Sequence, residues 1–292
     1  MVPTLEQARR IISQGDSKPL GSNHGLMHIV DINGKPLLYK GYEEVIVKCK
    51  LQRAIFLHLL EKRVGGLEFR LRFPERTKKR GEIIELESDV LKRWNSTGIP
   101  GPILYDYDDS ALLIEVIDGP SYESLVESGE YSETHHRLLL DQISNIRQIA
   151  LDKEEPRLLH NDLTLYNFLY DGRAVPIDPG LVYRQNIGLR DLDAYINLTF
   201  CYTLVAPPPI GKYRPQTRET FDWILRDFIA SLGKPTVQRM LDQNTSSSRI
   251  EAAYLKATIP LGNNELYLGL IEMCGPDRCK KVGYELKHRL EK

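Results

Sequence analysis

Short runs of alternating apolar and polar residues, separated by turn residues, are typical of the first part of the chain. Asn33-Gly34 is the kind of pair that forms the tight turn of a β-hairpin, and Asp108-Asp109-Ser110 is a second turn-rich sequence between apolar runs. A capped helix is expected before them, from Thr4 to Ile12, with Gly15 as its stop. The pattern predicts four strands around the two turns: 26–32, 36–39, 103–107 and 111–117.

Helical spacing of apolar residues is more frequent later in the chain. It predicts helices over about 50–62, over 83–95, over 134–151 and after Pro215, whereas residues 158–181 are typical of short strands and loops. The helix after Pro215 carries a packing stripe of four residues and ends at Gly233; the four are Phe221, Leu225, Phe228 and Leu232. Strands come first and helices second, which favours an α+β fold.

Candidate chemistry is concentrated in LLHNDLTLYNFLY (residues 158–170) and in VPIDPG (residues 175–180). Asp162, Asn167 and Asp178 occur there in the order strand, His-x-Asp-x4-Asn, strand, Asp-Gly turn, strand, Asp-x-Gly. Their carboxylate and amide oxygens are donors that Mg²⁺ prefers, and a bound cation can neutralise a transferring phosphoryl group. The alternative interpretation is that these side chains only stabilise local turns, as Asx residues often do.

This arrangement resembles the catalytic core of protein kinases. The resemblance implies an ATP-dependent phosphotransferase in which Asp162 accepts the proton of the attacking hydroxyl. It also implies that Asn167 and Asp178 are the ligands of Mg²⁺.

The same resemblance implies nucleotide-binding residues upstream. Lys40 matches the lysine that contacts the ATP phosphates, with Lys48 and Lys50 as rivals. Glu87 would be its ion-pair partner, with Glu85 as the rival. Backbone groups near Glu115 and Ile117, at the end of the predicted strand 111–117, would form hydrogen bonds with the adenine edge. The turn 21–25 would cover the phosphates.

Within this superfamily the match is closest to an atypical branch: the RIO kinases, the small kinase of the KEOPS complex and the lipopolysaccharide (Kdo) kinases. The sequence RDLD at 190–193 resembles their acidic segment at the start of the next helix. Asn161 occupies the place of the arginine that reads activation-loop phosphate, so control by activation-loop phosphorylation is not expected. Only a dozen residues separate Asp178 from Asp191, without an Ala-Pro-Glu segment, which leaves the acceptor open.

Composition adds few constraints. A formal net charge of -1 argues against a nucleic-acid footprint over the whole surface, but residues 70–80 carry six positive charges and one negative. That run is expected to contact RNA or a phosphorylated partner, or to be a solvated loop balanced by Glu82 and Glu85. Four scattered cysteines and no export signal favour a cytoplasmic protein, and no apolar run suits a membrane span. Cys274 and Cys279 lack the second ligand pair of a metal site.

The combined prediction is an α+β, bilobal protein-kinase-like fold. Residues 1–117 would form a nucleotide-binding lobe of antiparallel sheet plus helix, and 118–292 a mainly helical lobe with the catalytic loop and extra C-terminal helices. The expected activity is that of an atypical serine/threonine kinase or an autophosphorylating ATPase that uses ATP and Mg²⁺. Two alternatives remain: a kinase for a sugar or lipid-linked sugar, and a nucleotide-binding scaffold without turnover.

Overall fold

The computed structural model describes a large part of the chain. It comprises residues 2–20, 26–42, 70–71, 79–179, 184–185, 189, 192–193, 196–197, 200–201, 204 and 215–232. Several predictions lie outside these residues: the turn 21–25, the helix 50–62, Lys48 and Lys50, and the pair Cys274 and Cys279.

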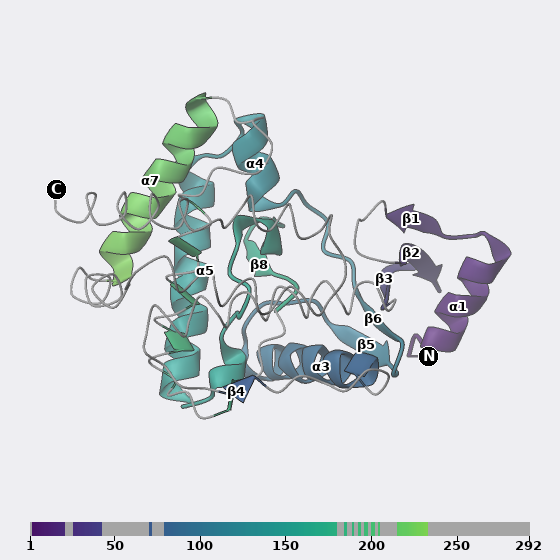
Figure 1. Cartoon of the computed structure of the whole chain (residues 1–292). Coiled ribbons are helices and arrows are strands. Elements are labelled where there is room, and N and C mark those ends of the chain that lie inside the picture. Colours follow the sequence, from purple (N-terminus) through teal and green to yellow (C-terminus); the bar gives the residue numbers. More distant parts are fainter. Residues whose placement is uncertain are drawn as a thin grey trace, which may run out of the picture.

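An antiparallel sheet in the order β1-β2-β3-β6-β5 forms the first lobe (Figure 1). Its strands are β1 (Lys18–Leu20), β2 (Met27–Ile32), β3 (Lys35–Gly41), β5 (Leu104–Tyr107) and β6 (Ala111–Glu115). Asn33 and Gly34 both have positive φ, 58° and 76°, as a tight hairpin turn requires. Both predicted hairpins are confirmed, although β6 ends at Glu115 and not at Ile117.

Helix α1 (Leu5–Gln14) packs against one face of this sheet. Thr4 and Gln7 form a capping box at its start, and Gly15 ends it in the left-handed conformation, so the predicted helix is confirmed. The face that α1 covers is a small apolar cluster in which Leu5 and Ala8 meet five sheet residues: Val30, Ile32, Leu37, Ala111 and Leu113.

Helix α3 (Lys79–Thr97) lies between the sheet and the second lobe, and it is longer than the predicted 83–95. Trp94, on this helix, is fully buried and donates its indole N–H to the carbonyl of Leu158 at 2.9 Å. Leu112 and Ile114 of β6 belong to the same core as α3, whereas Leu113 faces α1. Strand β6 is therefore buried on both faces, which explains its continuous apolar sequence.

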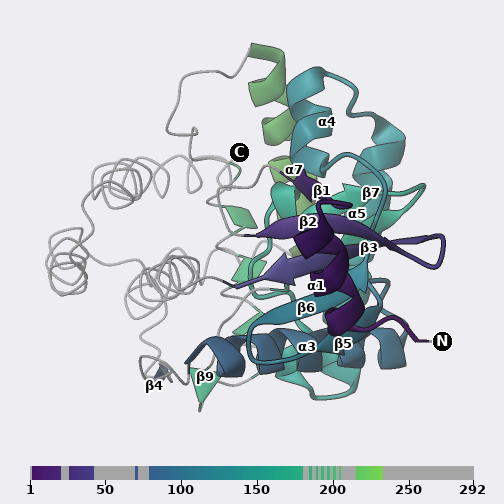
Figure 2. The ribbon, with the colours of Figure 1, turned by 90° about the vertical axis from the view of Figure 1, so that its right-hand side faces the viewer.

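The second lobe is mainly helical, with α4 (Tyr122–Ser128), α5 (Glu133–Asp152) and α7 (Pro215–Leu232) (Figure 1). The predicted helices 134–151 and after Pro215 are confirmed, and the predicted stripe on α7 is buried. Strands β7 (Phe168–Tyr170) and β8 (Ala174–Pro176) form a hairpin, with the 3₁₀ turns η1 (Pro156–Leu158) and η2 (Leu165–Asn167) before it. In Figure 2, β4 (Arg70–Leu71) lies beside β9 (Arg184–Gln185), and the two pair antiparallel.

The linker between the lobes is fixed against this hairpin. Tyr170 N–H donates to the carbonyl of Pro120 at 2.9 Å, and Ser121 forms a bridge with Leu169. A Cβ at Gly119 would lie 1.9 Å from the carbonyl oxygen of Tyr170. A glycine is therefore required where the linker crosses the hairpin.

We expect Gly119→Ala to lower the free energy of unfolding by about 1–3 kcal/mol, because the clash is with backbone and requires the linker to shift. Urea denaturation measures the change. Gly81→Ala is the matched control: it adds the same methyl inside α3, 3.3 Å from the Cβ of Asp109, and should change stability by under about 1 kcal/mol. Equal stability of Gly119→Ala and the wild type would contradict the close packing.

Candidate active site

A buried ion pair joins the sheet to α3. Lys40 Nζ, from β3, lies 2.5 Å from Glu87 Oε1, from α3, and the two side chains are 8% and 2% exposed. Lys40 Nζ also lies 3.5 Å from Asp178 Oδ1, so three of the predicted site residues come together. Glu85, the rival to Glu87, is exposed on the helix.

Tyr42 also contacts Glu87, and sequence reasoning missed it. Its hydroxyl donates to Glu87 Oε2, while Lys40 donates to the other carboxylate oxygen. Burial, followed by the nearby charge of Glu87, raises the pKa of Tyr42 well above its ordinary value. The available signal was its position two residues after Lys40, which places both side chains on the same face of an extended strand.

The backbone of Asp162 is held on both sides. Its N–H donates to His160 Nδ1 at 3.3 Å, and its carbonyl accepts from Asn167 Nδ2 at 2.8 Å. The His-x-Asp-x4-Asn spacing is therefore a closed local structure, with Asn167 at the end of η2 bonded back to Asp162. The Asp162 side chain is half-buried at the surface of this loop.

His160 links that loop to the segment leading to Asp178. Its Nε2 lies 2.9 Å from the carbonyl of Ile177, which can only accept, so the proton is on Nε2 and Nδ1 is left to accept from Asp162. The ring lies between Trp94 and Phe168, with centroid distances of 5.5 Å and 5.4 Å. Burial lowers the pKa of His160, against the opposing charges of Asp162 and Asp178.

Acid should destabilise the folded chain through His160. Its ordinary pKa is 6.5 and the folded value is lower, so below that pH the unfolded chain binds the extra proton and is favoured. The stabilisation by neutral His160 is complete above its pKa in the unfolded chain, and it is lost as the pH falls toward its lower pKa in the folded chain. We expect urea denaturation to show a decline in stability as the pH falls below about 6.5, and this decline should be smaller in His160→Gln. An equal decline in both proteins would contradict this account.

The hairpin brings the two predicted metal ligands to the same end of β7 and β8. Ile177 N–H donates to the carbonyl of Asn167 at 2.9 Å, so Asp178 follows the residue paired with Asn167. Asp178 has a positive φ of 47°, and Asn161 N–H donates to the carbonyl of Pro179 at 2.8 Å, which holds the turn.

This donor set fits magnesium. The side-chain amide nitrogen of Asn167 donates to the carbonyl of Asp162, which leaves the amide oxygen as the atom that can coordinate a metal ion. The Asp178 side chain is 33% exposed. Among the described residues no group of three or more His, Cys, Asp and Glu side chains forms a metal site. Two protein ligands completed by substrate phosphates are the usual arrangement for Mg²⁺.

Glu115 and Ile117 lie at the end of β6, where the chain leaves the sheet. Glu115 N–H donates to the carbonyl of Ile103 at 2.8 Å, and its carboxylate accepts from Ile103 N–H at 3.2 Å. The Glu115 side chain thus anchors β6 to the segment before β5, a role that the sequence did not suggest. The predicted contacts with adenine stay predictions.

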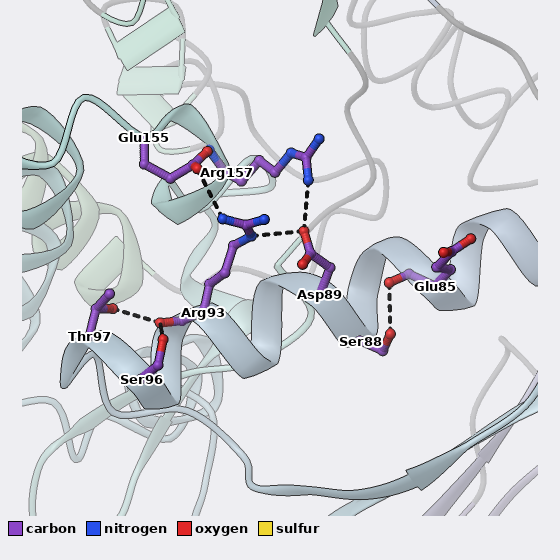
Figure 3. A network of polar contacts seen from close by, with 8 residues as sticks. All are labelled: Glu85, Ser88, Asp89, Arg93, Ser96, Thr97, Glu155 and Arg157. Atoms are coloured by element: carbon purple, nitrogen blue, oxygen red, sulfur yellow. Dashed lines mark hydrogen bonds and ion pairs between the residues drawn. The ribbon is translucent and has the colours of Figure 1, made fainter.

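A network of charges connects α3 to the segment before His160 (Figure 3). Asp89 Oδ2 accepts from Arg93 at 2.8 Å and from Arg157 at 2.9 Å, and Arg93 also reaches Glu155 at 3.0 Å. Burial opposes ionisation of Asp89, but the two arginines outweigh it and lower its pKa. Arg157 is more than half exposed, so the network contributes little stability and mainly orients α3.

The predicted acidic segment 190–193 is described at two residues. Asp193 is buried and accepts two hydrogen bonds from Arg147 of α5, at 2.7 Å and 2.8 Å. It also accepts from Asn197 at 2.9 Å. This carboxylate therefore holds α5 to the chain that follows the site.

Comparison with known proteins shows to which family the chain belongs. The family model of the RIO domain matches residues 32–181, just over half of the 292 residues. The chain belongs to the RIO family. It is thus a member of the atypical, protein-kinase-like superfamily, and the predicted bilobal α+β fold is confirmed. This family is one of atypical kinases and ATPases.

Two curated relatives of the RIO-family chain carry the name EKC/KEOPS complex subunit BUD32. One, from Enterocytozoon bieneusi (strain H348), is 25% identical over 143 residues, which cover 42% of this chain and 68% of the relative. The other, from Encephalitozoon cuniculi (strain GB-M1), is 26% identical over 156 residues, which cover 53% and 66%. The chain thus spans about two thirds of the length of these relatives. No helix among the described residues is long and apolar enough to cross a membrane.

Proposed function

We propose that this RIO-family chain is an ATP- and magnesium-dependent phosphotransferase, acting as an atypical serine/threonine protein kinase or an autophosphorylating ATPase. The observation that carries the proposal is the buried Lys40–Glu87 pair, whose lysine lies 3.5 Å from Asp178. The ammonium group of Lys40 is held by the buried carboxylate of Glu87 and lies beside the partly exposed Asp178. A positive charge in this position can bind a polyphosphate that carries a metal ion.

Each residue has a role in this proposal. Lys40, oriented by Glu87, binds the ATP phosphates, and the backbone at Glu115 and Ile117 binds the adenine edge. Asp162 accepts the proton of the acceptor hydroxyl as that oxygen attacks the γ-phosphorus. Asn167 and Asp178 would hold Mg²⁺, and the metal ion supplies charge neutralisation to the phosphates when bound.

The two lobes have different roles in the proposed reaction. Residues 1–117 would form the nucleotide-binding lobe, and residues 118–292 the lobe with the catalytic loop and further helices. The proposed boundary falls between the end of β6 at Glu115 and the start of α4 at Tyr122. ATP would bind between a sheet residue, Lys40, and a residue of the second lobe, Asp178.

Partners are proposed from the relatives and from charge. Because both curated relatives are named as subunits of the KEOPS complex, we propose a protein partner for this chain. The basic run 70–80 is the proposed contact for RNA or ribonucleoprotein, and a cytoplasmic location remains the prediction from sequence.

Labelled ATP tests the proposed function. The purified chain is incubated with Mg²⁺ and ATP labelled at the γ-phosphate, and the label is followed to the chain itself, to an added generic protein, to added sugars and to inorganic phosphate. Label on protein or in phosphate supports the proposal. Label on a sugar would favour the small-molecule kinase, and ATP binding without any movement of label would favour a scaffold.

A further inference from the structure

We propose that Tyr42 is a positioning residue of this site: its hydroxyl holds Glu87, and through Glu87 it holds Lys40 in the orientation that binds the ATP phosphates. The inference rests on the proposed function and adds to it a residue that the family motif does not supply. It is carried by the hydrogen bond from the Tyr42 hydroxyl to Glu87 Oε2.

The position of Tyr42 follows from the sheet. Lys40 pairs with Leu112 of β6, and the ladder continues past Gly41, since Tyr42 N–H donates to the carbonyl of Ser110 at 2.9 Å. Lys40 and Tyr42 are therefore two residues apart in extended backbone and share a face. Both side chains extend from that face to Glu87 on α3.

The two donors hold Glu87 differently. Lys40 Nζ also lies 3.5 Å from Asp178, and in the proposed reaction it binds phosphate, so its bond to Glu87 is shared with other groups. Tyr42 is only 3% exposed, and its hydroxyl, protonated at neutral pH, is a donor to Glu87. The tyrosine thus anchors one carboxylate oxygen independently of what the lysine binds.

The Asp89 network, which is also on α3, shows what burial changes. The Asp89 network also ties this helix to the second lobe, but its side chains are 31–55% exposed and solvent screens them. Tyr42 and Glu87 are both buried, so their hydrogen bond is far less screened. Tyr42, which directly follows β3, therefore holds Glu87 through a hydrogen bond that solvent screens little.

Tyr42→Phe tests the inference in the full chain, because it removes only the hydroxyl. We expect kcat/KM for ATP to fall about tenfold, mostly through a higher KM, because a misplaced Lys40 binds the ATP phosphates less tightly. Tyr105→Phe is the matched control: Tyr105 lies on β5, its hydroxyl accepts a hydrogen bond from Lys35, and it packs against the cluster under α1, away from the site. That control should keep the wild-type kcat and KM.

A double-mutant cycle separates positioning from general destabilisation. If Tyr42 acts through Glu87, Tyr42→Phe should lower kcat/KM by less than about twofold when Glu87→Gln is already present. An unchanged kcat/KM in Tyr42→Phe, or the same tenfold loss in both backgrounds, would overturn the inference alone. A wild-type chain that neither binds nor consumes ATP would overturn the proposed function, and this inference with it.

Discussion

Asp162→Asn should lower the rate of phosphoryl transfer by about 10²–10⁴-fold, the range typical of losing a general base. The substitution keeps the shape of the side chain but removes its ability to take a proton. ATP affinity should remain within a few-fold of the wild type, because the proposed nucleotide contacts lie at Lys40 and at the end of β6. Single-turnover transfer of labelled phosphate measures the rate, and equilibrium titration with ATP measures the affinity.

Asp171→Asn is the matched control for this loss. Asp171 is exposed in the turn of the β7–β8 hairpin, nine residues along the chain, and should keep the wild-type rate. The backbone of Asp162 is fixed through its own N–H and carbonyl, so the asparagine should fold normally. A rate that survives Asp162→Asn would assign the base to another residue.

Lys40→Met should have two effects at once. Glu87 loses the cation that compensates its charge in a buried position, so the free energy of unfolding should fall by about 3–5 kcal/mol. ATP binding should be lost as well, because the proposed phosphate contact is gone. Urea denaturation and ATP titration measure the two effects separately.

The double variant Lys40→Met/Glu87→Gln distinguishes the two effects. It removes the uncompensated charge, so part of the stability should return, while ATP affinity should not. Lys35→Met, an exposed lysine of the same strand, is the control and should leave both unchanged. ATP affinity that recovers together with stability would mean that Lys40 has only a structural role.

The elements that could be predicted from sequence are those in which local signals agree. Helix α1 has its capping box and its glycine stop, and the β2–β3 hairpin has Asn33-Gly34 at the turn. Helix α4 was missed because it is seven residues long, too short for a periodic pattern to develop. Local sequence predicts an element when it is long or carries its own caps.

Some contacts of the candidate site could be predicted from the sequence, and others could not. The resemblance to protein kinases implied that Glu87 is the ion-pair partner of Lys40, and the structure places Lys40 beside both Glu87 and Asp178. The contact of Tyr42 with Glu87 joins residues 45 positions apart, and that of Arg157 with Asp89 joins residues 68 apart. Such contacts depend on how α3 packs between the lobes, which no local pattern in one sequence specifies.

The role of Gly119 could be predicted only in part. Asp118-Gly119-Pro120 was predictable as the end of a strand, but the need for glycine comes from the carbonyl of Tyr170, fifty-one residues later. A turn signal in the sequence can therefore coincide with a packing requirement between the linker and the β7–β8 hairpin. No local pattern indicates that the Glu115 side chain anchors β6 by accepting from Ile103 N–H.

The proposed metal-dependent phosphoryl transfer can be measured as the rate of ATP consumption at increasing magnesium concentration, in the wild type and in Asp178→Asn. We expect the wild type to be inactive without Mg²⁺ and to reach a maximal rate as Mg²⁺ is added, whereas Asp178→Asn, which lacks the proposed carboxylate ligand, should lose most of that rate. Consumption in the presence of a chelator, or the same magnesium dependence in both proteins, would contradict the proposal.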